Sequence, residues 1–185
     1  MEDLIYTPME ESFDWNEGNK DLVERYYVRK YCVGVTDSGD DYCVLIHSNR
    51  VCLICLAPSH RLIVEKKRIV KLDWEVGKGV NRLANTVSGK WKHGAQRLKP
   101  SSPLAIAVCE DGTRLQLNSA ITGKLIEINA SLLDQPSLLL DDPIGAGYLA
   151  IVLPEIKTCD IYRNSLLSQE EYEAKVQKNR SASST

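Results

Sequence analysis

The feature that most limits the fold of this chain is a series of short apolar, β-branched runs separated by turn residues. Residues 42–47 (YCVLIH) and 50–56 (RVCLICL) are almost continuously apolar, and only Ser48 and Asn49 separate them. A two-residue connection between such runs is typical of a β-hairpin, and continuous apolarity indicates burial on both faces. We therefore expect a β-hairpin held between two apolar layers.

Further strands are expected along the chain. Residues 69–76 (IVKLDWEV) alternate, which predicts a strand with Val70, Leu72, Trp74 and Val76 on its buried face. The runs 104–109 and 113–117 predict a second hairpin that turns through Glu110, Asp111 and Gly112, and strands are also expected at 124–129 and 148–153. Ser168 and Glu171 have the spacing of a capping box before the helix formers at 169–178. The predicted class is mostly β with one short C-terminal helix.

The length of 185 residues, 43% of them hydrophobic, suits one domain with tails. We expect a flexible acidic N-terminal segment at 1–20, a single domain at 21–178 and a disordered polar tail at 179–185. A membrane span would need roughly 20 consecutive apolar residues, and the chain contains no such run. Its acidic start is also unlike a signal peptide. We therefore expect it in the cytosol or nucleus.

That compartment is reducing, so the six cysteines are expected to be buried thiols. Cys52 and Cys55 form a C-x-x-C, but no second pair follows to complete a zinc site, and in a strand their side chains point to opposite faces. His47, His60 and His93 have no metal-ligand spacing. No metal is implied.

Charge is distributed unevenly along the chain. Residues 57–99 carry 11 Lys and Arg against 3 Asp and Glu, whereas the segments on both sides are acidic. This pattern fits a surface for an acidic partner, and it equally fits a solvated face that folds back on the acidic flanks. Within the block, residues 87–99 predict a raised basic loop whose candidate partner-binding residues are Lys90, Trp91, Lys92, His93, Arg97 and Lys99.

Catalytic signatures are absent from the sequence. No serine lies in a nucleophile-elbow phrase, and Gly77-Lys78-Gly79 lacks the spacing of a phosphate-binding loop. A non-enzymatic interaction module is therefore the prediction.

Residues 86–90 (TVSGK) recur as 120–124 (AITGK), and each phrase is followed by a Pro-containing turn and an apolar strand. This predicts two β half-motifs related by a pseudo-two-fold axis, with Gly89 and Gly123 at equivalent places.

The second half of the chain resembles the glycine cleavage H-protein, on residues 119–154 and 165–174. The resemblance implies a biotinyl/lipoyl-carrier-like barrel-sandwich hybrid with a preceding β-hairpin. In that family a lysine at the tip of the central hairpin carries the cofactor, about eleven residues before the glycine that Gly123 matches. Gly112 occupies the place here, and residues 100–123 contain no lysine. A swinging arm needs a tethering amine at the tip, so we expect no lipoate, biotin or other cofactor.

From about Asp21 to Lys175 the chain is similar to the Abitram (Simiate) family. The phrases that carry the similarity are LVERYYVRKY (22–31), HSNRVCLI (47–54), VSGKWKHGAQRL (87–98), the Asp111–Gly112 turn, TGKLIEIN (122–129), PSLL (136–139), GYLAIVLP (147–154) and LLSQEEYE (166–173). The similarity implies actin as partner, an influence on filament assembly, a role in transcription with nuclear-speckle components as further partners, and a location in the nucleus, the cytoplasm and actin-rich cell projections.

One alternative remains open at this point. In a nucleic-acid or chromatin-associated module, phosphates would contact Lys66, Lys67, Arg68, Lys90, Lys92 and Arg97. The two nearby aromatic residues, Trp74 and Trp91, provide little surface for base stacking.

Overall fold

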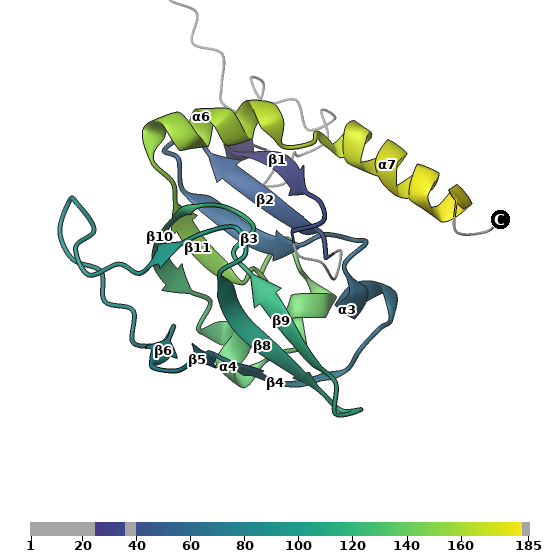
Figure 1. The fold of residues 1–185 in the computed structure, drawn as a ribbon, viewed down its shortest axis with the longest axis horizontal. Helices are drawn as coiled ribbons and strands as arrows, with labels where there is room; N and C mark the ends of the chain where they lie inside the picture. The colour runs from purple at the N-terminus through teal and green to yellow at the C-terminus, as the bar shows by residue number, and fades with distance from the viewer. Residues whose placement is uncertain (1–24, 36–39, 183–185) are drawn as a thin grey trace, which may run out of the picture.

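The computed structural model describes residues 25–35 and 40–182, and strands form most of its regular structure (Figure 1). The larger sheet is antiparallel and has six strands. In spatial order these are β1 (Tyr27–Cys32), β2 (Tyr42–His47), β3 (Cys52–Leu56), β11 (Ala150–Leu153), β10 (Gly123–Ile128) and β7 (Arg97–Leu98). The mostly β class is confirmed.

A smaller sheet lies below the larger one in the view of Figure 1. It has three strands in the order β4 (Ile69–Asp73), β8 (Pro103–Cys109) and β9 (Arg114–Asn118), and a short ribbon follows β4, made of β5 (Glu75–Gly77) and β6 (Val80–Asn81). One apolar core joins the two sheets, since Ile54 and Leu125 of the larger sheet are buried in the same cluster as Leu104 and Leu117 of the smaller.

The β2–β3 hairpin is buried on both faces, as its sequence predicts. Val44 and Ile54 belong to the main core, whereas Cys43 and Cys55 belong to a second cluster on the opposite face. The turn is one residue longer than expected. The amide of His47 donates to the Val51 carbonyl at 2.9 Å, and Arg50 takes up a positive φ of 74°. Three residues, 48–50, therefore lie between the hydrogen-bonded His47 and Val51, and the last of them has the left-handed conformation that such turns require.

The alternation expected for residues 69–76 is interrupted by a β-bulge. The pairing of β4 with β8 shifts register between Ile69 and Lys71. Leu72 and Trp74 are buried as predicted, but Ile69 is also buried and Val70 is 59% exposed. The assignment of Val70 to the core is wrong because the bulge adds one residue and so reverses the face of those before it.

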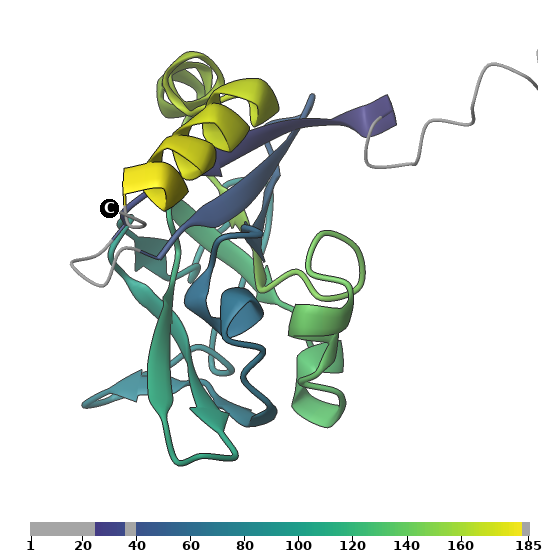
Figure 2. The same cartoon turned by 90° about the vertical axis from the view of Figure 1, so that its right-hand side faces the viewer.

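The expectation of one short C-terminal helix is also wrong. The described residues contain five helices: α3 (Arg61–Val64), α4 (Ser131–Asp134), α5 (Leu138–Asp141), α6 (Ile156–Ser165) and α7 (Gln169–Ala182). α6 lies across one end of the larger sheet, and α7 projects beyond the body (Figures 1 and 2). Cys159 is the one residue of α6 that is buried. A helix that buries so little needs no apolar residues at every third or fourth position, so its sequence does not show the helical pattern.

The predicted cap of the last helix is present. The Ser168 amide donates to the Glu171 carboxylate at 2.7 Å, and the Glu171 amide donates back to Ser168 Oγ at 3.3 Å. The helix runs to Ala182, four residues past its expected end and into the segment assigned to the tail. The acidic segment 1–20 lies outside the described residues.

The two repeated phrases do not occupy equivalent places. Gly89 lies in an exposed turn with φ of 65° and nothing within 4 Å of an added Cβ. Gly123 lies in β10 of the larger sheet, where an added Cβ would come within 2.6 Å of Val152 Cγ1. The predicted equivalence of Gly89 and Gly123 is wrong, because one glycine supplies a left-handed turn and the other a close approach between strands.

Candidate interaction surface: the basic loop

The connection between β6 and β7 carries the candidate partner-binding residues, and it projects to the left of the body in Figure 1. Its tip is a small hairpin. The amides and carbonyls of Ser88 and His93 exchange hydrogen bonds of 3.0 and 2.9 Å. The Lys92 amide donates to the Gly89 carbonyl at 3.1 Å, and Lys92 itself takes up a positive φ of 53°. The turn at 89–92 therefore presents Lys90 and Trp91 at the outermost point of the loop.

Trp91 is the most exposed of the large apolar side chains in the described residues, at 71%. Lys90 Nζ lies 6.0 Å from the centre of the indole, at the limit of a cation–π contact. The backbone behind the indole is held, since Lys124 Nζ of β10 donates to the Trp91 carbonyl at 2.7 Å. The tip is thus fixed through its main chain while its aromatic side chain faces solvent.

Six residues were predicted to form the partner surface, and the structure divides them into a tip and a base. Lys90, Trp91 and His93 are exposed at the tip with the half-buried Lys92. Arg97 and Lys99 are exposed at the base, where residues 97–98 form β7 and pair with β10. The prediction of a raised loop is therefore confirmed for the tip and wrong for residues 97–98, because Leu98 is an apolar anchor that is only 2% exposed.

Lys124, which local sequence does not mark as a candidate, belongs to the same surface. It stands directly opposite Arg97 in the β10–β7 pair. The TGK phrase at 122–124 recurs in the loop itself as SGK, but this similarity gave no indication that Lys124 contacts Trp91. The contact depends on strand register, which local sequence does not show.

The base of the loop is held by three polar side chains that were not singled out from the sequence. Arg82 Nη1 donates to Gln96 Oε1 at 2.5 Å, and Gln96 Nε2 donates to the Asn81 carbonyl at 2.8 Å. Asn85 Nδ2 donates to the Leu125 carbonyl at 3.0 Å, while Asn85 Oδ1 accepts from the Gln96 amide at 2.9 Å. Both ends of the loop are therefore joined to one another and to β10.

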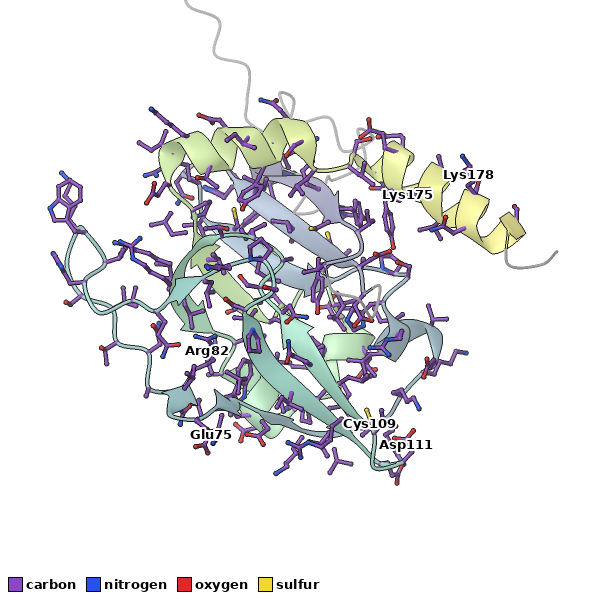
Figure 3. All side chains as sticks on the ribbon, viewed as in Figure 1. Glu75, Arg82, Cys109, Asp111, Lys175 and Lys178 are labelled. Atoms are coloured by element: carbon purple, nitrogen blue, oxygen red, sulfur yellow. The ribbon has the colours of Figure 1, made fainter. Side chains whose placement is uncertain are left out.

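The second group of basic residues, Lys66 to Arg68, lies elsewhere. Lys67 Nζ contacts Asp111 Oδ2 at 2.5 Å and Glu65 at 3.4 Å, and Arg68 is 3.5 Å from Glu110. These side chains line a shallow hollow at the tip of the β8–β9 hairpin, at the lower right of Figure 3 beside the labelled Asp111. The hollow has as many carboxylates as cations.

The nucleic-acid hypothesis joined six basic side chains into one phosphate-binding surface. In the structure, Lys66, Lys67 and Arg68 line the hollow at the β8–β9 tip together with Glu65, Glu110 and Asp111. The other three belong to a different part of the chain, since Lys90 and Lys92 lie at the tip of the basic loop and Arg97 lies in β7 at its base. A continuous phosphate-binding track needs a stripe of uncompensated cations. The arrangement does not favour that alternative.

Gly112 ends the turn of the β8–β9 hairpin, as the sequence predicts. Its amide donates to the Cys109 carbonyl at 3.0 Å, and its φ is 79°. The tip thus consists of Glu110, Asp111 and Gly112. Lys67, from the connection between α3 and β4, reaches this tip and forms an ion pair with Asp111. Gly112 supplies the left-handed residue of a three-residue turn.

All six cysteines are free, and all but the half-buried Cys32 are buried. Burial raises the pKa of Cys43 and of Cys52 to about 12. Cys52 belongs to the main core and Cys55 to the second cluster, so the C-x-x-C residues face apart as predicted. Thiolates are the reactive and metal-binding form of cysteine, so these thiols are suited to packing. Among the described residues, no three His, Cys, Asp or Glu side chains gather in a way that could hold a metal.

The fold is that of a glycine cleavage H-protein-like domain. The family model for the glycine cleavage H-protein matches residues 79–179. The crystal structure of a glycine cleavage system H protein from Mycobacterium marinum superposes with a TM-score of 0.52, covering 80% of this chain and 96% of that chain at 16% identity. At this identity the likeness shows the fold alone. The matched family is a carrier-type domain and not a catalytic one.

Relatives of much higher identity define the family more narrowly. Protein Abitram of Bos taurus is 40% identical over 158 residues, which cover 85% of this chain and 84% of that protein. Protein Abitram of Homo sapiens is 39% identical over 153 residues (82% and 84%), and that of Drosophila melanogaster is 40% identical over 173 residues (93% and 77%). The chain belongs to the Abitram family. None of the helices in the described residues is both long and apolar enough to cross a membrane.

Proposed function

We propose that this chain is a non-enzymatic actin-binding protein that modulates the assembly of actin filaments and has a nuclear role in transcription. The proposal is supported by its membership of the Abitram family and by the basic loop. It places the chain in the nucleus, including speckles, and in the cytoplasm at actin-rich projections.

The exposed tip of the loop is the observation that carries the proposed binding site. Trp91 is 71% exposed between two lysines, on a backbone that Lys124 holds in place. Tryptophan is enriched among the residues that contribute most to protein interfaces, and it contributes a large apolar area when a partner covers it. Lysines around it would contact carboxylates on the acidic surface of actin.

The test is co-sedimentation with actin filaments. The triple variant K90E/K92E/R97E reverses three loop charges, and we expect it to lose filament binding while its unfolding midpoint stays unchanged. Reversal of Arg97 creates an opposite-charge pair with Lys124 across the strands, so the sheet edge keeps its stability. Binding by the unmodified chain should weaken as salt rises, since exposed charges are screened over about 8 Å at physiological ionic strength.

The control is K157E/K175E/K178E, which reverses three exposed lysines on α6 and α7 (Lys175 and Lys178 are labelled in Figure 3). Arg163 is unsuitable as a control position because its guanidinium donates to the His47 carbonyl at 3.0 Å and supports the fold. Loss of binding in both variants would indicate a general charge effect. Binding by K90E/K92E/R97E at the level of the unmodified chain would refute this site.

A further inference from the structure

Arg82 is an unusual component of the loop base because it is a buried cation held by neutral groups. Its exposed fraction is 6%, and no carboxylate lies within ion-pair distance of it among the described residues. Nε and Nη2 both donate to the Pro103 carbonyl, at 2.9 and 2.7 Å, and Nη1 donates to Gln96. Burial lowers the pKa of the guanidinium, which reflects the cost of removing its charge from water.

Burying a charge without an opposite charge lowers the free energy of unfolding, and an apolar residue at the same place would lower it less. The position of Arg82 shows what the guanidinium does there. It connects Pro103, at the start of β8, to Gln96, at the end of the loop, and its own amide donates to the Trp74 carbonyl at 3.0 Å. Arg82 thus links the smaller sheet to both sides of the loop base. Figure 3 shows it on the side of the body from which the loop leaves.

Gln96 connects the loop base to the larger sheet through hydrogen bonds. Its backbone carbonyl accepts from the Leu125 amide at 2.8 Å, and its backbone amide donates to Asn85. Asn85 in turn donates to the carbonyls of Leu125 and Ile126, at 3.0 and 3.3 Å. The two strands of the loop also pack closely at Gly94, where an added Cβ would come within 2.5 Å of the Thr86 carbonyl oxygen.

We infer that Arg82 is a positioning residue, which with Asn85 and Gln96 holds the basic loop in its binding conformation before any partner arrives. A long surface loop normally loses conformational entropy when it binds. A clamp at its base removes part of that cost in advance. This inference deepens the proposed function and rests on it only for the effect on actin binding.

The experiment compares hydrogen exchange in R82K and N85A with exchange in the unmodified chain. In R82K, lysine keeps the charge but cannot donate to Pro103 and Gln96 together, because it lacks the planar guanidinium. Asn85 is only half-buried, so N85A should fold even if R82K does not. We expect amides of residues 86–96 to exchange about tenfold faster or more in both variants, while β8 and β9 keep their protection. The control is R163K, whose guanidinium also donates to backbone carbonyls but on α6.

Unchanged exchange at 86–96 in R82K and N85A would overturn the inference, and so would an equal increase in every strand. The binding arm measures affinity for actin filaments in the same variants, and we expect it to fall for R82K and N85A and to hold for R163K. Faster loop exchange with unchanged affinity would also refute the positioning role. Failure of the unmodified chain to bind actin would contradict the proposed function, while the exchange result would still decide whether the clamp exists.

Discussion

Acid should destabilise this protein through His60, the buried N-cap of α3. His60 is 1% exposed, its Nδ1 accepts a hydrogen bond from the Leu62 amide at 3.2 Å, and its ring packs edge-on to Tyr42 at 5.3 Å. In the described part of the chain its Nε2 has no hydrogen-bond partner. The site thus holds the neutral ring and offers little to the protonated one.

Burial is the main cause that lowers the pKa of His60, to about 4, and Arg61 adds to it, whereas the nearby Asp40 and Asp41 act in the opposite direction. The unfolded chain takes up a proton near pH 6.5, so it binds more protons than the folded chain between pH 6.5 and 4. The stability from this group is therefore complete above pH 6.5 and is lost as pH falls through that window. The difference corresponds to about 3 kcal/mol.

The perturbation is H60N, because asparagine keeps a side-chain acceptor for the Leu62 amide and does not titrate. Urea unfolding followed by tryptophan fluorescence at several pH values between 4 and 7 gives the free energy of unfolding. We expect the unmodified chain to lose about 3 kcal/mol more than H60N over this range. V64A, at an exposed position of the same helix, should keep the steep dependence of the unmodified chain. Parallel curves for H60N and the unmodified chain would refute the reasoning.

Two other substitutions test local features of the fold. G112K places a side chain at φ of 79° and should lower the free energy of unfolding by about 1 kcal/mol, whereas G77K, at an open position without positive φ, should have a smaller effect in the same urea titration. Y172F keeps the 4.0 Å ring stacking on Tyr31 but removes the hydroxyl that accepts from the Ser59 amide at 2.9 Å. Y172F should lower the free energy of unfolding by about 1–2 kcal/mol, measured by thermal unfolding. A loss equal to that of the exposed control Y26F would contradict this account.

Patterns that depend on neighbours in sequence predicted much of the fold. The continuous apolarity of β2 and β3 indicated burial on both faces, and the Glu110–Gly112 turn and the Ser168–Glu171 cap were each readable within a few residues. The β-bulge in β4 could not be read in this way. It arises from the pairing of Ile69 and Lys71 with β8, so the exposure of Val70 is decided by a strand more than thirty residues away.

The candidate surface divides in the same manner. Lys90, Trp91 and Lys92 were visible as charged and aromatic residues next to glycines, which predicted an exposed turn. The roles of Lys124 and Arg82 could not be predicted in this way. They follow from the register of β10 against β7 and from the hydrogen bonds that Arg82 donates to both Pro103 and Gln96. The repeated SGK and TGK phrases led to a wrong prediction for a related reason. Gly89 forms a left-handed turn, whereas Gly123 allows a close contact between strands, and the tripeptides themselves do not show this difference.

The most direct test of actin binding through the basic loop is hydrogen exchange of the full chain with and without actin filaments. If actin covers the loop, amides of residues 86–99 should exchange more slowly in the complex, and the β8–β9 tip around Asp111 and Gly112 should exchange as it does in the free chain. Protection at the β8–β9 tip or on α7, with none at 86–99, would contradict the account.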